Sequence, residues 1–231
     1  MWGELLELPL FGIGLTLAAY ALAQKMYLRT GSIFFNPVAL SIGSIIVFLL
    51  LFRIPYRSYF EGGRYIHFLL GPSVVALAVP LYNRREEIMA RRKPILLGIF
   101  AGAVSSIVSA SGLAWLLGGS RDVVLSLAPK SVTTPIAIGI VEKIGGIAPL
   151  TAALVVLTGC LGAICGPEFC RLIGVRDSTA MGLAVGTASH GIGTARMLEE
   201  DRLGGAVSGL AIGLNGLVTA FILPLLVTWF I

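Results

Sequence analysis

Charged side chains are scarce in this sequence. Of its 231 residues, 13% are charged and 56% are hydrophobic, and the mean hydropathy is +0.92. Soluble domains carry about 25% charged residues, because a folded surface in water needs polar cover. This scarcity excludes an ordinary soluble domain and predicts an integral membrane protein.

Catalytic and cofactor motifs are missing as well. The sequence has no Walker loop, no His-Glu-x-x-His pair and no Gly-x-Ser-x-Gly elbow. The three cysteines, Cys160, Cys165 and Cys170, do not have the paired spacing of a structural zinc site. We therefore expect no catalytic residues, no metal site and no cofactor, and we predict that the protein is not an enzyme.

The net charge of +5 does not indicate a nucleic-acid partner. Most basic residues lie between apolar runs, where they act as topology signals and contact lipid headgroups. The first apolar run, 8–23, follows Glu4 and Glu7 rather than a basic segment, so we expect no cleavable signal peptide. The predicted location is the bacterial cytoplasmic (inner) membrane, crossed several times.

Long apolar runs dominate what is present. About 20 apolar residues are needed for a helix that spans the hydrocarbon. We predict an all-α polytopic membrane protein with about eight hydrophobic segments, several of them broken or re-entrant. The segments are 8–24, 33–52, 66–82, 94–118, 121–141, 147–165, 178–197 and 204–231.

The basic residues predict an orientation. With eight full spans and both ends outside, the basic loop 83–93 would be cytoplasmic, together with Lys143. Arg121, Arg171 and Arg176 would then be outside. A re-entrant segment would change this assignment.

A weak internal repeat is visible. Asn36-Pro37 resembles Thr134-Pro135, and 71–73 resembles 186–188. Interrupted segments in two halves are typical of inverted-repeat transporters, so we expect repeats 8–118 and 121–231 in a single transmembrane domain. Chance similarity between apolar segments is the alternative. Glycines four residues apart favour close helix packing, either within the chain or in a homo-oligomer, for which a dimer is our working expectation. They are Gly98 and Gly102, Gly162 and Gly166, and Gly205, Gly209 and Gly213.

The segment 129–135 carries the strongest candidate for a binding site. A lysine in an apolar stretch is costly without a partner or water, so Lys130 is a functional candidate; a lysine that reaches the membrane surface is the alternative. We expect Thr134 to cap a helix with Pro135 in its first turn, so that free N–H groups bind an anion such as a carboxylate. Ser131 and Thr133 would add hydroxyl groups.

A second polar break lies at 186–194. Its glycines are expected to unwind a helix, and His190 could bind a substrate or carry a proton; a structural hydrogen bond is the alternative. The first half offers matching breaks at Asn36-Pro37 and at 71–73, which we expect to meet the same central site. The candidate binding residues are Asn36, Pro37, Gly71, Ser73, Lys130, Ser131, Thr133, Thr134, Pro135, Thr187, Ser189, His190, Gly191 and Thr194.

These segments resemble the LrgB/CidB family, which includes the membrane domain of the plastidal glycolate/glycerate translocator. The resemblance rests on 35–37, 69–82, 129–137 and 186–196 and covers about 8–231. It implies two functions. One is a carrier of a small carboxylate such as glycolate, glycerate or pyruvate. The other is an antiholin-like modulator of murein hydrolase export and cell lysis. The family also implies a small membrane partner of the LrgA/CidA type.

The residues themselves favour the carrier, because a simple oligomeric pore does not need paired broken helices with a buried lysine and histidine. A lipid-binding scaffold subunit is a third alternative, supported by the basic loop 83–93.

Overall fold

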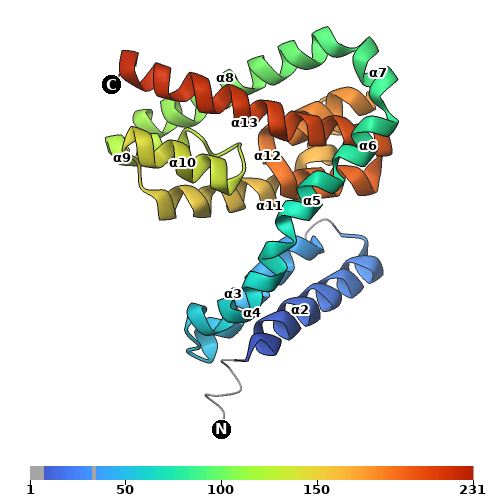
Figure 1. Ribbon diagram of the computed structural model, residues 1–231, viewed down its shortest axis with the longest axis vertical. Helices are drawn as coiled ribbons and strands as arrows, with labels where there is room; N and C mark the ends of the chain where they lie inside the picture. The colour runs from blue at the N-terminus through green and yellow to red at the C-terminus, as the bar shows by residue number, and fades with distance from the viewer. Residues whose placement is uncertain (1–7, 33–34, 231) are drawn as a thin grey trace. The chain divides into compact units, whose positions relative to one another are not determined.

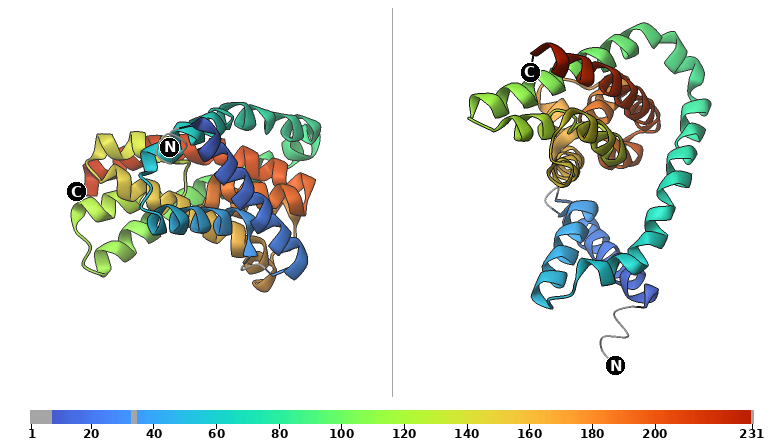
Figure 2. Two further views of the ribbon diagram at one scale, coloured as in Figure 1. Left: turned by 90° about the horizontal axis from the view of Figure 1, so that it is seen from below. Right: turned by 60° about the vertical axis from the view of Figure 1, so that its left-hand side comes forward.

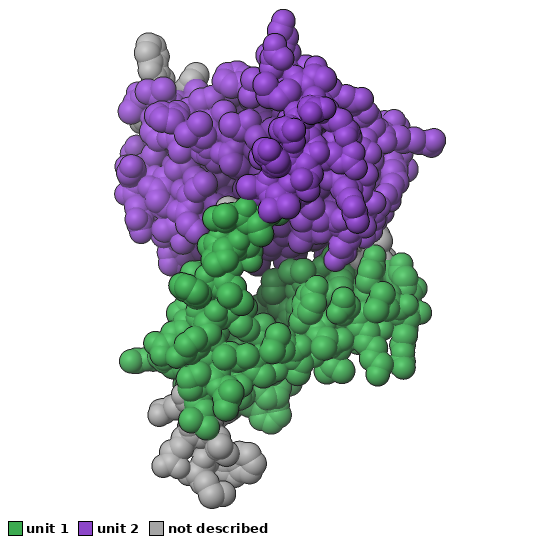
Figure 3. Space-filling model, turned by 45° about the vertical axis from the view of Figure 1, so that its right-hand side comes forward, with its two compact units in different colours: residues 1–77 green, residues 78–231 purple. Residues whose placement is uncertain are grey.

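The computed structural model describes residues 8–32 and 35–230, and the regular elements in these ranges are helices. The all-α prediction is confirmed. The chain divides into two compact units, residues 1–77 and 78–231, coloured separately in Figure 3. Four described stretches are long and apolar enough to cross a membrane: 56–83, 92–116, 148–172 and 202–228. Residues 33–34 of the second predicted segment and residue 231 of the eighth lie outside the described residues.

Unit 1 contains α2 (Pro9–Thr30), α3 (Pro37–Leu51), α4 (Tyr56–Phe68) and α5 (Leu70–Ala76). Helices α2 and α4 touch through their backbones, because a Cβ on Gly12 would overlap the Tyr59 carbonyl. A bond of 2.9 Å between the hydroxyls of Thr16 and Tyr59 joins the same two helices. The small residues on both helices allow this close approach.

The third predicted segment, 66–82, begins too late, because the helical stretch starts at Tyr56. It is interrupted at Leu69 and again at Leu77. Each interruption lies three residues before a proline, Pro72 or Pro80. Proline has no N–H group to donate to the carbonyl four residues earlier, so the regular hydrogen-bond pattern breaks there.

Unit 2 is built on three long helices, α8 (Arg92–Leu116), α11 (Ala148–Leu172) and α13 (Arg202–Phe230), and begins with α6 (Ala78–Asn83) and α7 (Arg85–Ala90). The fifth predicted segment, 121–141, is not one span. It forms α9 (Arg121–Leu127) and α10 (Thr134–Ile144), and the connecting residues 128–133 contain Pro129. In Figure 1, α9 and α10 lie at the end of unit 2 where the C-terminus lies, and the views in Figure 2 agree.

Helix α12 (Ser178–Glu200) is a hairpin of two arms. Ser189 and His190 have non-helical backbone angles, so the chain folds back between them. Met181 and Met197 belong to one hydrophobic cluster, although a straight helix would hold them about 24 Å apart. Both arms also meet the start of α13, because a Cβ on Gly204 would lie 2.7 Å from Met197 Cε and 3.1 Å from the Ser178 carbonyl. The seventh predicted segment is therefore re-entrant.

Two hairpins, α9–α10 and α12, determine which helix ends lie together at each end of unit 2. Arg91 donates to Asp177 (2.8 Å) and joins the start of α8 to the start of α12. Arg196 pairs with Glu168 at 3.0 Å and joins the second arm of α12 to the end of α11. We call this the basic end; its cationic residues are Arg84, Arg85, Arg91, Arg92, Lys93, Arg171, Arg176, Arg196 and Arg202.

The opposite end holds few cations. Ser126 of α9 accepts from the Ile147 N–H at 2.7 Å, so the α9–α10 hairpin returns to the start of α11. Arg121 and Lys143 lie there. The positive-inside rule then predicts that the basic end is cytoplasmic. The prediction for Arg171, Arg176 and Lys143 is wrong, since two re-entrant hairpins replace two full spans.

Cysteine labelling in intact cells tests this arrangement. In a parent whose three native cysteines are replaced by alanine, Arg176→Cys and Arg92→Cys are expected to react only after the inner face is opened to an impermeant maleimide. Lys143→Cys is expected to react from outside. All three positions are exposed. Labelling of Arg176→Cys together with Lys143→Cys from outside would contradict the hairpin arrangement.

The glycine pairs pack within the chain. A Cβ on Gly102 of α8 would lie 2.8 Å from Thr187 Cγ2, and one on Gly166 of α11 would lie 3.1 Å from Val185 Cγ2. Both neighbours belong to the first arm of α12. Within the chain, the ladder from Gly205 to Gly213 is not one packing surface, because nothing lies within 4 Å of a Cβ on Gly213. Packing of this ladder in a homo-oligomer stays a prediction.

Candidate functional site

The tip of the α9–α10 hairpin carries Lys130 and Ser131. Lys130 is half-buried, and its Nζ donates to Ser106 Oγ of α8 at 3.5 Å. No carboxylate of the described residues forms an ion pair with it. The N-cap of α10 is Thr133 and not Thr134, because Thr133 has the extended backbone (ψ 148°) that precedes the helix. Its side chain makes no capping bond, so the first N–H groups of α10 remain available to an anion.

The tip of the α12 hairpin is formed by Ser189 and His190. His190 has φ 43° and ψ −138°, a strained conformation for a residue with a side chain. Its Nε2 lies 2.9 Å from the Val155 carbonyl oxygen of α11, and its ring packs where Gly159 has no side chain. Ser189 Oγ donates to Val185 O at 2.6 Å. Neither hairpin-tip residue is a glycine.

The glycines of segment 186–194 do not lie at the tip of the hairpin. A Cβ on Gly186 would lie 2.5 Å from the Ser208 carbonyl oxygen, so Gly186 allows close contact with α13 and does not unwind the helix. Gly191 follows the tip in the second arm, with nothing within 4 Å of its Cβ position. The expectation that glycines form the break is therefore wrong. A strained backbone held by packing forms it instead.

Asn215 of α13 joins the two hairpins. Its Nδ2 donates to the carbonyl oxygen of Ser131 at 3.2 Å and to that of Thr187 at 3.0 Å. The side chain is 1% exposed. Asn215 is not among the residues predicted from the sequence, although a lone amide in the apolar run 204–231 is a usable signal, because polar groups in membrane helices bond across to neighbouring helices.

Two hydroxyls beside this junction have no hydrogen-bond partner in the described part of the chain. They are Ser131 Oγ and Thr187 Oγ1, on residues that are 0% and 5% exposed. Buried polar atoms are nearly always bonded, so orphaned hydroxyls in a native protein call for an explanation. They are available to a bound molecule.

Thr194 continues the polar region along the second arm. Its Oγ1 donates to the His190 carbonyl at 2.8 Å and lies 2.6 Å from Ser208 Oγ. Because the Thr194 hydroxyl has one proton and uses it on His190, Ser208 is the donor in the second bond. Thr194 is thus a support for the tip.

The candidate residues of the first half lie in unit 1. Asn36 caps α3, since its Oδ1 accepts from the N–H groups of Val38 and Ala39 at 3.1 Å, and Pro37 opens that helix. Gly71 and Ser73 lie in α5, where both are exposed and Ser73 Oγ donates to Leu69 O at 2.7 Å. That these residues meet the site at Lys130 stays a prediction. The division into repeats 8–118 and 121–231 also stays a prediction.

The acidic residues near the ends of α11 and α12 are largely paired. Arg196, 14% exposed at its side chain, binds Glu168 (3.0 Å) and Glu200 (2.5 Å), and Arg171 also binds Glu200. Asp201 instead accepts from the Gly204 N–H at the start of α13. The hydrogen bond from Arg91, with a second from the Ala180 N–H, lowers the pKa of Asp177.

Comparison with known proteins identifies the family. The model of the LrgB-like family matches residues 16–229. The chain belongs to the LrgB family. Among its relatives, the protein named YxaC from Bacillus subtilis is 38% identical over 216 residues, 94% of each chain. The holin-like proteins CidB of Staphylococcus aureus and Staphylococcus epidermidis are 33% and 31% identical over the same length and share.

No solved structure matches this LrgB-family chain. Family membership and the membrane-spanning helices make it a multi-pass protein of the bacterial inner membrane. Resemblance to the family, predicted from four motifs, is confirmed.

Proposed function

We propose that this protein is a carrier, not an enzyme, and that it moves a small carboxylate across the membrane. The observation that carries the proposal is the junction at Asn215, where the tips of two re-entrant hairpins meet beside unbonded buried hydroxyls. Hairpin tips that meet from opposite ends are typical of transporters, which place binding sites at broken helices.

The chemistry of the junction suits an anion. Lys130 supplies a positive charge without a carboxylate partner among the described residues, and α10 supplies uncapped N–H groups at the positive end of its dipole. Ser131 and Thr187 can bond a hydroxyl or keto group. Both hydroxyls are buried, so substrate reaches them only after the tips separate. Glycolate, glycerate and pyruvate have the matching groups.

A second candidate function is a holin-like role with a small membrane partner. The comparisons favour this candidate, because the CidB relatives are named holin-like. The hairpin junction favours the carrier, since a lytic pore does not need a closed polar site. The two functions differ in a measurable way: a carrier saturates and discriminates between solutes, whereas a pore releases neutral solutes too.

Uptake into proteoliposomes tests the carrier. Saturable uptake of one radiolabelled acid (glycolate, glycerate or pyruvate) is expected, without leakage of trapped sucrose. Lys130→Ala is expected to raise the half-saturating concentration roughly tenfold to a hundredfold, the effect of losing a hydrogen bond to a charged group. Lys143→Ala, an exposed change on the same hairpin, is the control and is expected to leave uptake unchanged.

Two other outcomes decide against the carrier. Release of sucrose together with the acids would support the pore. No uptake with or without a co-reconstituted small partner would leave the holin-like role without transport. An equal loss of uptake in Lys130→Ala and Lys143→Ala would show that Lys130 is not part of the binding site.

A further inference from the structure

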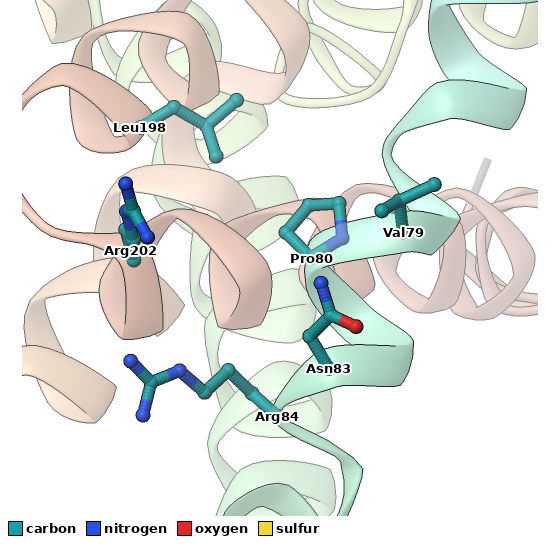
Figure 4. A pocket seen from close by; sticks show the side chains of 6 residues that line it. All are labelled: Val79, Pro80, Asn83, Arg84, Leu198 and Arg202. Carbon is teal, nitrogen blue, oxygen red and sulfur yellow. The ribbon is translucent and has the colours of Figure 1, made fainter.

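A pocket of about 470 Å³ lies at the basic end, within unit 2. Helix α6 and the residue after it form one wall, and the second arm of α12 and the first residue of α13 form the other. The lining residues are Val79, Pro80, Asn83, Arg84, Leu198 and Arg202 (Figure 4). The lining therefore combines two guanidinium groups and an amide with three apolar side chains.

The charges around the pocket leave room for an anion. Arg84 bonds Glu87 at 2.5 Å, whereas Arg202 has no hydrogen bond or ion pair to a described residue. The neighbouring carboxylate, Asp201, accepts from the N–H of Gly204. Glu86 lies 3.5 Å from Arg85. Each of these carboxylates thus has an ion pair or a hydrogen bond, and among the described residues the Arg202 guanidinium has neither.

The surroundings of the pocket suit the headgroup region of a membrane. The Arg85 guanidinium stacks on the ring of Tyr82, 4.5 Å from its centroid. Tyr82 and Val79 are 66% and 62% exposed although they adjoin a basic loop. Aromatic rings collect at the membrane surface, and clusters of basic residues next to a spanning helix attract anionic lipids.

We propose that this pocket binds the phosphate of an anionic phospholipid headgroup. Arg202 and Arg84 hold the phosphate, Asn83 bonds the polar part of the headgroup, and the acyl chains lie along Val79 and Pro80. A soluble phosphate ester would match the cations but would leave the apolar wall uncovered. The proposal does not depend on transport.

Lipid titration of the purified full chain in neutral detergent tests the proposal. Native mass spectrometry compares short-chain phosphatidylglycerol with phosphatidylcholine of the same chain length, and glycerol 3-phosphate serves as the free headgroup. Preference for phosphatidylglycerol is expected, and R84Q/R202Q is expected to weaken its binding roughly tenfold to thirtyfold. R92Q/K93Q removes the same charge from the basic end, outside the pocket, and is the matched control.

Each outcome decides. Loss of preference in R84Q/R202Q but not in R92Q/K93Q supports the pocket. Equal loss in both variants, or no preference in the parent, overturns it. Competition by glycerol 3-phosphate as strong as that of phosphatidylglycerol assigns the pocket to a soluble anion and overturns the lipid. If the double variant does not fold, Arg202→Gln alone decides, because Arg202 makes no bond to a described residue.

Discussion

Asn215→Ala is expected to destabilise the protein and to abolish saturable uptake. The Asn215 side chain is buried, and its amide NH2 group donates to the carbonyl oxygens of Ser131 and Thr187. The change to alanine removes this NH2 group. Unbonded buried carbonyls cost about 1–3 kcal/mol each in soluble proteins, and interhelical bonds in membranes average about 0.6 kcal/mol. We therefore expect a loss of about 1–3 kcal/mol, measured as a lower temperature of unfolding in detergent.

Two variants make this result specific. Asn215→Asp keeps the shape but loses the donor, so it is expected to be at least as unstable as Asn215→Ala. Thr228→Ala lies on the same helix at an exposed position and is expected to unfold like the parent. An unchanged unfolding temperature in Asn215→Ala would show that these bonds do not hold the hairpins together.

Gly182→Ala is expected to have the other large effect. A Cβ on Gly182 would overlap the carbonyl oxygen of Gly204 and come within 2.8 Å of its Cα. The obstacle is backbone, which cannot turn aside as a side chain can, so α12 and α13 must move apart. Overpacking of this kind costs about 1–3 kcal/mol and sometimes more. Asn215 of α13 bonds both Ser131 and Thr187, so a displaced α13 should also disturb the proposed site. Uptake should therefore fall together with stability.

Gly213→Ala is the matched control for Gly182→Ala. Nothing lies within 4 Å of its Cβ position, and alanine favours a helix by about 1 kcal/mol relative to glycine. It is therefore expected to unfold at the temperature of the parent or slightly above. Equal destabilisation by both substitutions would mean that α12 and α13 are not in backbone contact.

The candidate site was predictable from the sequence only in part. Lys130 and Ser131 were found because a lysine and a hydroxyl between two prolines contradict their apolar surroundings, and Ser189 and His190 because they interrupt an apolar run. Asn215 was missed because a single amide in a good helix breaks no local pattern. Its importance arises from two segments 84 and 28 residues away that it bonds.

The sequence by itself determined that the chain is an all-helical membrane protein of the LrgB family. The features that determined this are the scarcity of charge, the apolar runs and the prolines at 72, 129 and 135. Each acts on nearby residues, so it can be recognised from composition and spacing. Only the tertiary structure decided that 121–144 and 178–200 are hairpins, and hence that Arg171 and Arg176 share the basic end. An apolar helix that crosses and one that turns back have the same composition. Contacts between distant residues, such as Met181 with Met197, separate them.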